Sequence, residues 1–258
     1  MFVAKTSPHD TYVPRQTFTT DPVIDGLLRK EDHWREATVI GLRNDGSPTA
    51  EPGQLRLLES NATNKLFIAA TLQSDTPASG DESGTFTLYL DADRGSTLAD
   101  QGCAGNVHSP APSDRRITFS YTAGSGVEQA VLSPITQVRG NCSGGYTALG
   151  AEPLWPMQIV VREPETRNKI VLEMSVTIPS NSLILGENML GFGFKHQNTA
   201  ATLVERFPYR DDALLLPAIN EVYSLETIRL SHLPATGPFL SENGWDGCCM
   251  SEADARTW

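Results

Sequence analysis

Acidic side chains gather in one ten-residue stretch, Asp91-Ala-Asp-Arg-Gly-Ser-Thr-Leu-Ala-Asp100, which is the strongest candidate for a chemical site. Asp91 and Asp93 are two residues apart, Gly95 permits a tight turn, and Asp100 supplies a further carboxylate. Calcium takes about 6–8 oxygen ligands in flexible geometry, so this loop predicts a bound calcium ion. The loop lacks the spacing and the closing Glu of an EF-hand. The alternative is a solvated turn in which the Asp side chains cap backbone amides.

Motifs of known catalytic sites are absent from the sequence. The five histidines are scattered, and no pair has the i, i+4 spacing of a helical zinc site: His9, His33, His108, His196 and His232. The sequence contains no Gly-x-Ser-x-Gly, no Walker loop and no dinucleotide fingerprint. We therefore expect a protein that binds rather than catalyses, with the histidines as surface or core residues.

The cysteines are Cys103, Cys142 and the adjacent pair Cys248 and Cys249, with no CxxC and no zinc-like spacing. Cys103 and Cys142 bracket a stretch that is typical of a loop plus a hairpin, so we predict a disulfide between them, with two free thiols as the alternative. Such a disulfide suits an oxidising compartment. Cys248 and Cys249 can hardly bond each other without straining the backbone, so they bond elsewhere, bond another chain or stay reduced.

Charge and hydropathy exclude several classes of partner. The net charge is −11, from 31 Asp and Glu against 20 Lys and Arg, and no basic run is present, so nucleic acid is not an expected partner. No window approaches the ~20 apolar residues of a membrane helix, so we expect no membrane span. The first eight residues lack the apolar core of a signal peptide; if the protein is exported, its leader has been removed or replaced. We expect a secreted, periplasmic or cell-surface protein.

Alternation with a period of two dominates the chain after residue 21. It is clearest in Lys169–Ile178, where one face carries Ile170, Leu172, Met174, Val176 and Ile178. Further strands are predicted at residues 54–59, 65–72, 85–91, 116–121, 127–132, 157–161, 190–194 and 223–230. A short helical period occurs near Leu27–Ala37. With 21 Gly and 17 Pro to form turns, these strands predict an all-β, jelly-roll-like sandwich of two antiparallel sheets.

The two ends of the chain differ from this central region. Residues 1–20 have no sustained periodicity, which predicts an extended arm or a covering strand. Residues 21–230 form the predicted sandwich, with no linker inside them. Residues 231–258 form a tail that contains Trp245 and Trp258, which are costly to leave exposed. We expect the tail to dock on the sandwich or on a partner.

Five motifs occur in order through residues 21–230. They are Pro22-Val-Ile-Asp-Gly26 followed by Asp32-His-Trp34 and Ala37, the strand Lys65–Asp75, the Asp-x-Asp strand Thr87–Gly95, the strand Glu173–Pro179 and the strand Leu190–His196. In this order they resemble the family nine carbohydrate-binding modules and related DOMON-like β-sandwich domains. The resemblance implies two antiparallel sheets packed face to face, with Trp34 packed into the sandwich. Related sandwiches often carry a structural calcium ion in the Asp-x-Asp loop.

The resemblance also indicates where a sugar would bind. The family uses aromatic rings that stack on pyranose rings, backed by polar side chains. Its binding Trp before the Asp-x-Asp strand has no counterpart in Ala78–Gly84. The second aromatic is matched by Phe207 or Tyr209, so the candidate ligand-binding residues are Phe207, Tyr209 and Arg210. Trp155 is a spare aromatic, which we expect in the core.

Three functions remain open on these observations. The first is a carbohydrate-binding or adhesive module with a structural calcium ion. The second is a structural subunit of an extracellular or membrane-associated assembly, in which a protein partner docks on the arm and the tail. The third is a haem-binding electron-transfer subunit, because the small subunits of the ethylbenzene dehydrogenase type resemble this sandwich and use Met and Lys as iron ligands. Met189 and Lys195 lie in the corresponding stretch.

Overall fold

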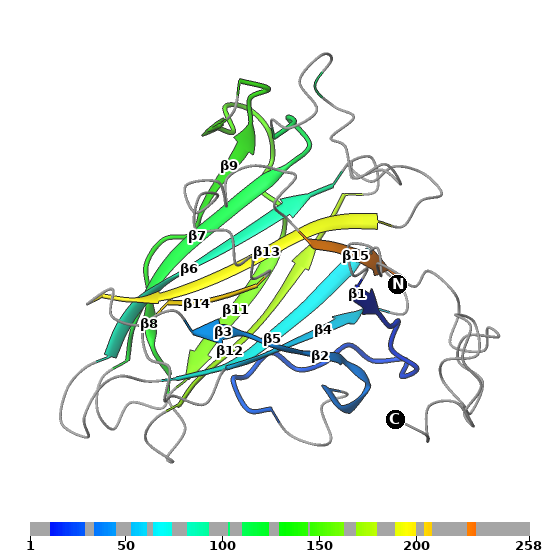
Figure 1. Ribbon diagram of the computed structural model, residues 1–258, viewed down its shortest axis with the longest axis vertical. Coiled ribbons are helices and arrows are strands. Elements are labelled where there is room, and N and C mark those ends of the chain that lie inside the picture. Colours follow the sequence, from blue (N-terminus) through cyan, green and yellow to red (C-terminus); the bar gives the residue numbers. More distant parts are fainter. Residues whose placement is uncertain are drawn as a thin grey trace, which may run out of the picture.

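The computed structural model describes residues 11–28, 34–44, 53–60, 64–73, 82–92, 103, 110–123, 129–143, 145–162, 169–179, 189–199, 204–207 and 226–230. Their strands form two sheets that pack face to face (Figure 1). Within these residues the helical element is one turn of 3-10 helix, η1 (Trp34–Glu36), which is too short to cross a membrane. The predicted all-β sandwich is confirmed.

The smaller sheet has five antiparallel strands. Their order is β11 (Met157–Arg162), β12 (Lys169–Thr177), β5 (Lys65–Gln73), β4 (Gln54–Glu59) and β2 (Thr38–Gly41). The nine residues of β12 pair with all nine residues of β5. These two long central strands therefore fix the register of the whole sheet.

The larger sheet has ten strands. The main order is β1 (Thr11–Val13), β15 (Glu226–Leu230), β13 (Met189–Asn198), β6 (Glu82–Asp91), β7 (Arg115–Ala123), β9 (Thr136–Gly140) and β10 (Tyr146–Ala148). Off this path, β14 (Val204–Phe207) pairs with β13 and β3 (Arg43–Asn44), and β8 (Val131–Leu132) pairs with β7. The pairing is antiparallel except between β1 and β15, which is parallel.

The core lies between the two sheets. The predicted inward face of β12 is confirmed, because Ile170, Leu172, Met174, Val176 and Ile178 are all buried in one cluster. The larger sheet contributes aromatic rings to this cluster from three neighbouring strands: Phe86, Phe119, Tyr121, Phe192 and Phe194. Burial of these side chains supplies the main driving force for closing the sandwich.

The expected helix near Leu27–Ala37 is not an α-helix in the described residues. Leu28 is not helical and η1 is a single turn, while residues 29–33 lie outside the description. The apolar residues of this segment instead cover the outer face of the five-stranded sheet, where Trp34 packs with Phe67. Trp34 is buried, as the resemblance implied, but outside the space between the sheets. In the described residues of this segment, the apolar side chains contact the sheet without forming an α-helix.

A buried carboxylate holds this covering segment on the sheet. Glu173 lies on the second face of β12, and its Oε2 accepts hydrogen bonds from the backbone N–H groups of Asp25, at 2.9 Å, and Gly26, at 2.7 Å. Gly26 has φ +78°, and a Cβ there would come within 2.7 Å of Arg162. The Ile-Asp-Gly turn therefore requires its glycine.

The N-terminal arm joins both sheets in its described part. Val13 is buried in the main core, and β1 pairs with β15 of the larger sheet. The Pro14 carbonyl accepts from the Glu59 N–H of β4, and the Gln16 N–H donates to the Glu59 carbonyl, both at 2.9 Å. Of the two expectations, an extended arm or a covering strand, the described residues therefore show a strand that pairs with the sandwich. The predicted tail, with Trp245, Trp258, Cys248 and Cys249, lies outside the described residues, and the domain boundaries stay predictions.

Candidate functional site

Asp91 ends β6 and is fully buried, beside a second buried carboxylate, Asp114, which immediately precedes β7. Asp114 Oδ1 accepts from the Ala92 N–H at 3.2 Å, and Oδ2 accepts from the Ala111 N–H at 2.7 Å. Asp114 therefore holds in place both the residue that follows β6 and the segment that precedes β7. Of the predicted calcium ligands, Asp93 and Asp100 lie outside the described residues, and the described part holds no group of three acidic, His or Cys side chains able to bind a metal. The calcium site stays a prediction.

Two tyrosines and an arginine pack together near these carboxylates. The Arg116 guanidinium lies 5.0 Å from the centre of the Tyr146 ring, and the Tyr89 and Tyr146 rings are 6.1 Å apart. Burial raises the pKa of the Tyr146 phenol, the charges of Asp114 and Asp91 raise it further, and the charge of Arg116 lowers it. Burial also raises the pKa of Tyr89. Both phenols therefore stay protonated, and the Arg116 charge offsets part of the effect of the neighbouring carboxylates on Tyr146.

The predicted disulfide is confirmed, since Cys103 and Cys142 are bonded. Cys142 adopts φ 58°, and its N–H donates to the Pro110 carbonyl at 3.0 Å. Gly140, at the end of β9, packs so closely that a Cβ would overlap the backbone of Pro110 and Ala111. The disulfide and these backbone contacts hold the β9–β10 turn against the segment that leads into β7.

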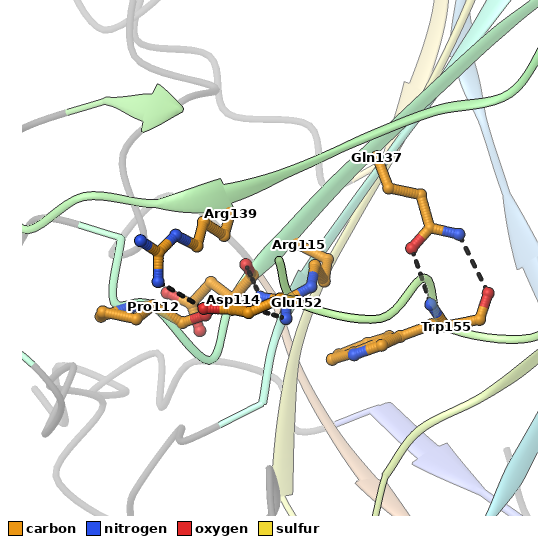
Figure 2. A network of polar contacts seen from close by, with 7 residues as sticks. All are labelled: Pro112, Asp114, Arg115, Gln137, Arg139, Glu152 and Trp155. Atoms are coloured by element: carbon orange, nitrogen blue, oxygen red, sulfur yellow. Dashed lines mark hydrogen bonds and ion pairs between the residues drawn. The ribbon is translucent and has the colours of Figure 1, made fainter. Parts of the chain in front are cut away.

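A network of polar contacts includes the ion pairs of Glu152 with Arg115 and Arg139 (Figure 2). The buried Arg115 guanidinium donates to the carbonyls of Pro112 and Asp114 at 2.6 and 2.9 Å, and to Glu152 Oε2 at 2.7 Å. Glu152 Oε1 accepts from Arg139. Burial lowers the pKa of Arg115, while Glu152 and Asp114 raise it again. The network ties the β10–β11 connection to β7 and β9.

Trp155 lies in the core, as we expected. It is buried, its ring lies 5.2 Å from the Arg115 guanidinium, and its backbone forms two hydrogen bonds with the Gln137 side chain, at 2.9 and 3.0 Å (Figure 2). A ring enclosed in this way cannot stack on a sugar. Trp155 is therefore a structural residue.

The opposite end of the sandwich contains a buried polar chain that sequence reasoning missed. The Tyr121 hydroxyl lies 3.0 Å from His196 Nε2, and His196 Nδ1 lies 3.1 Å from Glu205 Oε2. All three side chains are buried. The alternation that places Leu190, Phe192 and Phe194 inward also places His196 inward. This period of two could have predicted from the sequence that His196 is buried.

Phe207, at the end of β14, is the one predicted ligand-binding residue inside the described part of the chain. Its ring is half-buried and lies 6.2 Å from the Phe192 ring. Tyr209 and Arg210 lie outside the described residues. The ligand-binding role of all three stays a prediction.

Neither a protein-family model nor a curated protein matches this sequence. Among solved structures, the chain is similar to a family 9 carbohydrate-binding module from Caldicellulosiruptor kristjanssonii in complex with cellotriose. The match has a TM-score of 0.50 and 13% identity, and it covers 86% of this chain and 93% of the module. This chain has the family 9 fold. The resemblance drawn from the ordered motifs is thus confirmed at the level of the family 9 architecture, which extends over nearly the full length of the module.

Proposed function

We propose that this protein is a non-catalytic carbohydrate-binding module. The observation that carries the proposal is the family 9 fold, because the match covers 93% of a module that was solved with cellotriose. The confirmed disulfide supports a place in an oxidising compartment, and so a secreted, periplasmic or cell-surface location. The excess of acidic residues fits an uncharged glycan better than an anionic one.

In this proposal Phe207 contacts the sugar. Phe207 is half-buried at the end of β14, and its ring lies 6.2 Å from the Phe192 ring. An aromatic ring in this state stacks on the apolar face of a pyranose and loses little side-chain freedom when it does so. Tyr209 and Arg210 follow in sequence and would add a second ring and hydrogen-bond donors.

Calorimetry with cellotriose, together with an oligosaccharide array, tests this function. We expect wild-type protein to bind, and Phe207→Ala to weaken binding by about tenfold, which is the loss of about 1.4 kcal/mol. The matched control is Phe18→Ala, because Phe18 is also half-buried but lies against Arg35 in the N-terminal segment. If no oligosaccharide binds, or if both variants weaken binding equally, the proposal is wrong. A structural subunit would then be the better explanation.

A structural calcium ion beside Asp91 is the second part of the proposal. The buried carboxylates of Asp91 and Asp114, which lie at the exit of β6 into the Asp-x-Asp loop, support it. We expect calcium to raise the melting temperature and chelator to lower it, because an ion that binds only the folded state stabilises that state. Asp91→Asn should abolish the calcium effect, and Asp21→Asn should leave it intact. Melting curves that do not respond to either reagent would exclude the ion.

A further inference from the structure

Glu205 joins the two sheets at one end of the sandwich. Its strand, β14, belongs to the larger sheet, but its carboxylate accepts backbone N–H groups of the smaller sheet. Oε1 accepts from Gly53, just before β4, at 3.1 Å, and the carboxylate accepts from Gln73, the last residue of β5, at 3.3–3.4 Å. Because Glu205 is fully buried, water does not compete for these hydrogen bonds.

The chain is adapted to this contact at Gly53. A Cβ at Gly53 would overlap Glu205 Oε1 and would lie 2.9 Å from the Thr71 carbonyl oxygen. Only glycine lets the carboxylate approach the backbone here. Both the Glu205 carboxylate and the Thr71 carbonyl of β5 therefore require a glycine at residue 53.

The imidazole of His196 holds the carboxylate from the other side. His196 is the cross-strand partner of Glu205, and its ring stacks on Phe86 with the ring centres 4.9 Å apart. Its two nitrogens contact Glu205 and the Tyr121 hydroxyl. When Glu205 is a carboxylate it only accepts, so Nδ1 carries the hydrogen of that bond. The chain Tyr121–His196–Glu205 thus links β7, β13 and β14 to the ends of β4 and β5.

We propose that Glu205 is a positioning residue for the sugar-binding end of the module. Glu205 and Phe207 are two residues apart on β14, so they share one face, and the carboxylate that anchors the strand also sets where the Phe207 ring lies against Phe192. The inference rests on the proposed function, in which Phe207 contacts the sugar. The affinity for sugar then depends on the Glu205 carboxylate, which is buried and does not touch the ligand.

Glu205→Gln tests the inference, with Glu173→Gln as its matched control. Both glutamates are fully buried, and both accept two backbone N–H groups, but Glu173 holds Asp25 and Gly26 on the outer face of the smaller sheet. The readouts are hydrogen exchange of single amides, nuclear Overhauser contacts between the rings of Phe207 and Phe192, and the affinity for cellotriose. All are measured well below the melting temperature, so that loss of stability alone does not contribute.

We expect Glu205→Gln to speed amide exchange at Gly53 and Gln73 by about tenfold. The side-chain amide of Gln has only one acceptor oxygen, so its NH₂ group faces a backbone N–H that donated to the carboxylate. The Phe207–Phe192 contacts should weaken, and cellotriose affinity should fall by about tenfold. Glu173→Gln should speed exchange at Asp25 and Gly26 only, with affinity unchanged within about twofold. Unchanged exchange at Gly53 and Gln73, or unchanged ring contacts, would overturn the anchoring role without reference to any sugar.

A milder variant covers the case in which Glu205→Gln does not fold. Tyr121→Phe removes only the hydroxyl that contacts His196 and keeps the ring that packs against Phe86. It should change the His196 ring signals and lower cellotriose affinity by about twofold to threefold. An altered His196 with unchanged affinity would overturn the positioning role, whereas wild-type protein that binds no oligosaccharide would instead overturn the proposed function.

Discussion

Close packing of backbone on backbone makes Gly140 sensitive to a single added methyl group. The atoms that a Cβ would meet belong to the main chain of Pro110 and Ala111, which cannot rotate away. We expect Gly140→Ala to lower the free energy of unfolding by about 1–3 kcal/mol in urea denaturation. Gly41→Ala is the control, since nothing lies within 4 Å of its added Cβ and the change should be neutral or stabilising by up to about 1 kcal/mol. Equal losses in both variants would contradict the argument.

The ionisation of Asp21 should make the free energy of unfolding depend on pH in the acid range. Burial alone would raise its pKa, but hydrogen bonds from Lys65, Ser60 and Gln16 and the charge of Lys65 outweigh burial, so its pKa lies below 3.8. The ionised form is therefore stabilised in the folded state, and this contribution is present above 3.8 and disappears as the pH falls through the lower folded value. Asp21→Asn should be less stable than wild type at about pH 7. The difference should narrow as the pH falls below 3.8, as measured by urea denaturation at about pH 7 and at a series of lower values. A difference that is constant with pH would exclude this linkage.

At the scale of the element, the segment around η1 acts as a third layer on the five-stranded sheet. Trp34 is the largest side chain of its cluster, which also contains Leu58 and Phe67. We expect Trp34→Ala to lower the free energy of unfolding by about 3–5 kcal/mol. Amide exchange should increase first at Asp25 and Gly26, because these N–H groups are held in the same layer by Glu173. Exchange that increases equally in the larger sheet would show that the layer has no independent stability.

For the molecule as a whole, the N-terminal segment joins the two sheets at an edge of the sandwich. Deletion of residues 1–16 removes β1, the buried Val13 and the two backbone hydrogen bonds to Glu59. We expect a loss of about 3–5 kcal/mol, from one buried aliphatic side chain and several backbone hydrogen bonds. Deletion of residues 1–10 removes none of these contacts and is the control. Both proteins should be compared by thermal and urea unfolding; identical stabilities would mean that β1 contributes nothing.

The amino-acid sequence by itself indicated the long central strands and their inward faces, because a strand buried on one face needs apolar side chains at every second position, as β12 shows with Ile170, Leu172 and Met174. The short strands β2, β3, β9, β10 and β14 were not predicted, and the strand predicted at residues 127–132 covers only Val131–Leu132 of its described part. The sequence also indicated the disulfide, since Cys103 and Cys142 flank a loop and a hairpin. Only the tertiary structure decided what covers the second face of β12, where Glu173 is buried by the turn at Asp25 and Gly26. It alone brought Glu205 to Gly53, 152 residues earlier in the chain. Periodicity is a local property, whereas a buried carboxylate meets donors that only the packing of the two sheets brings within reach.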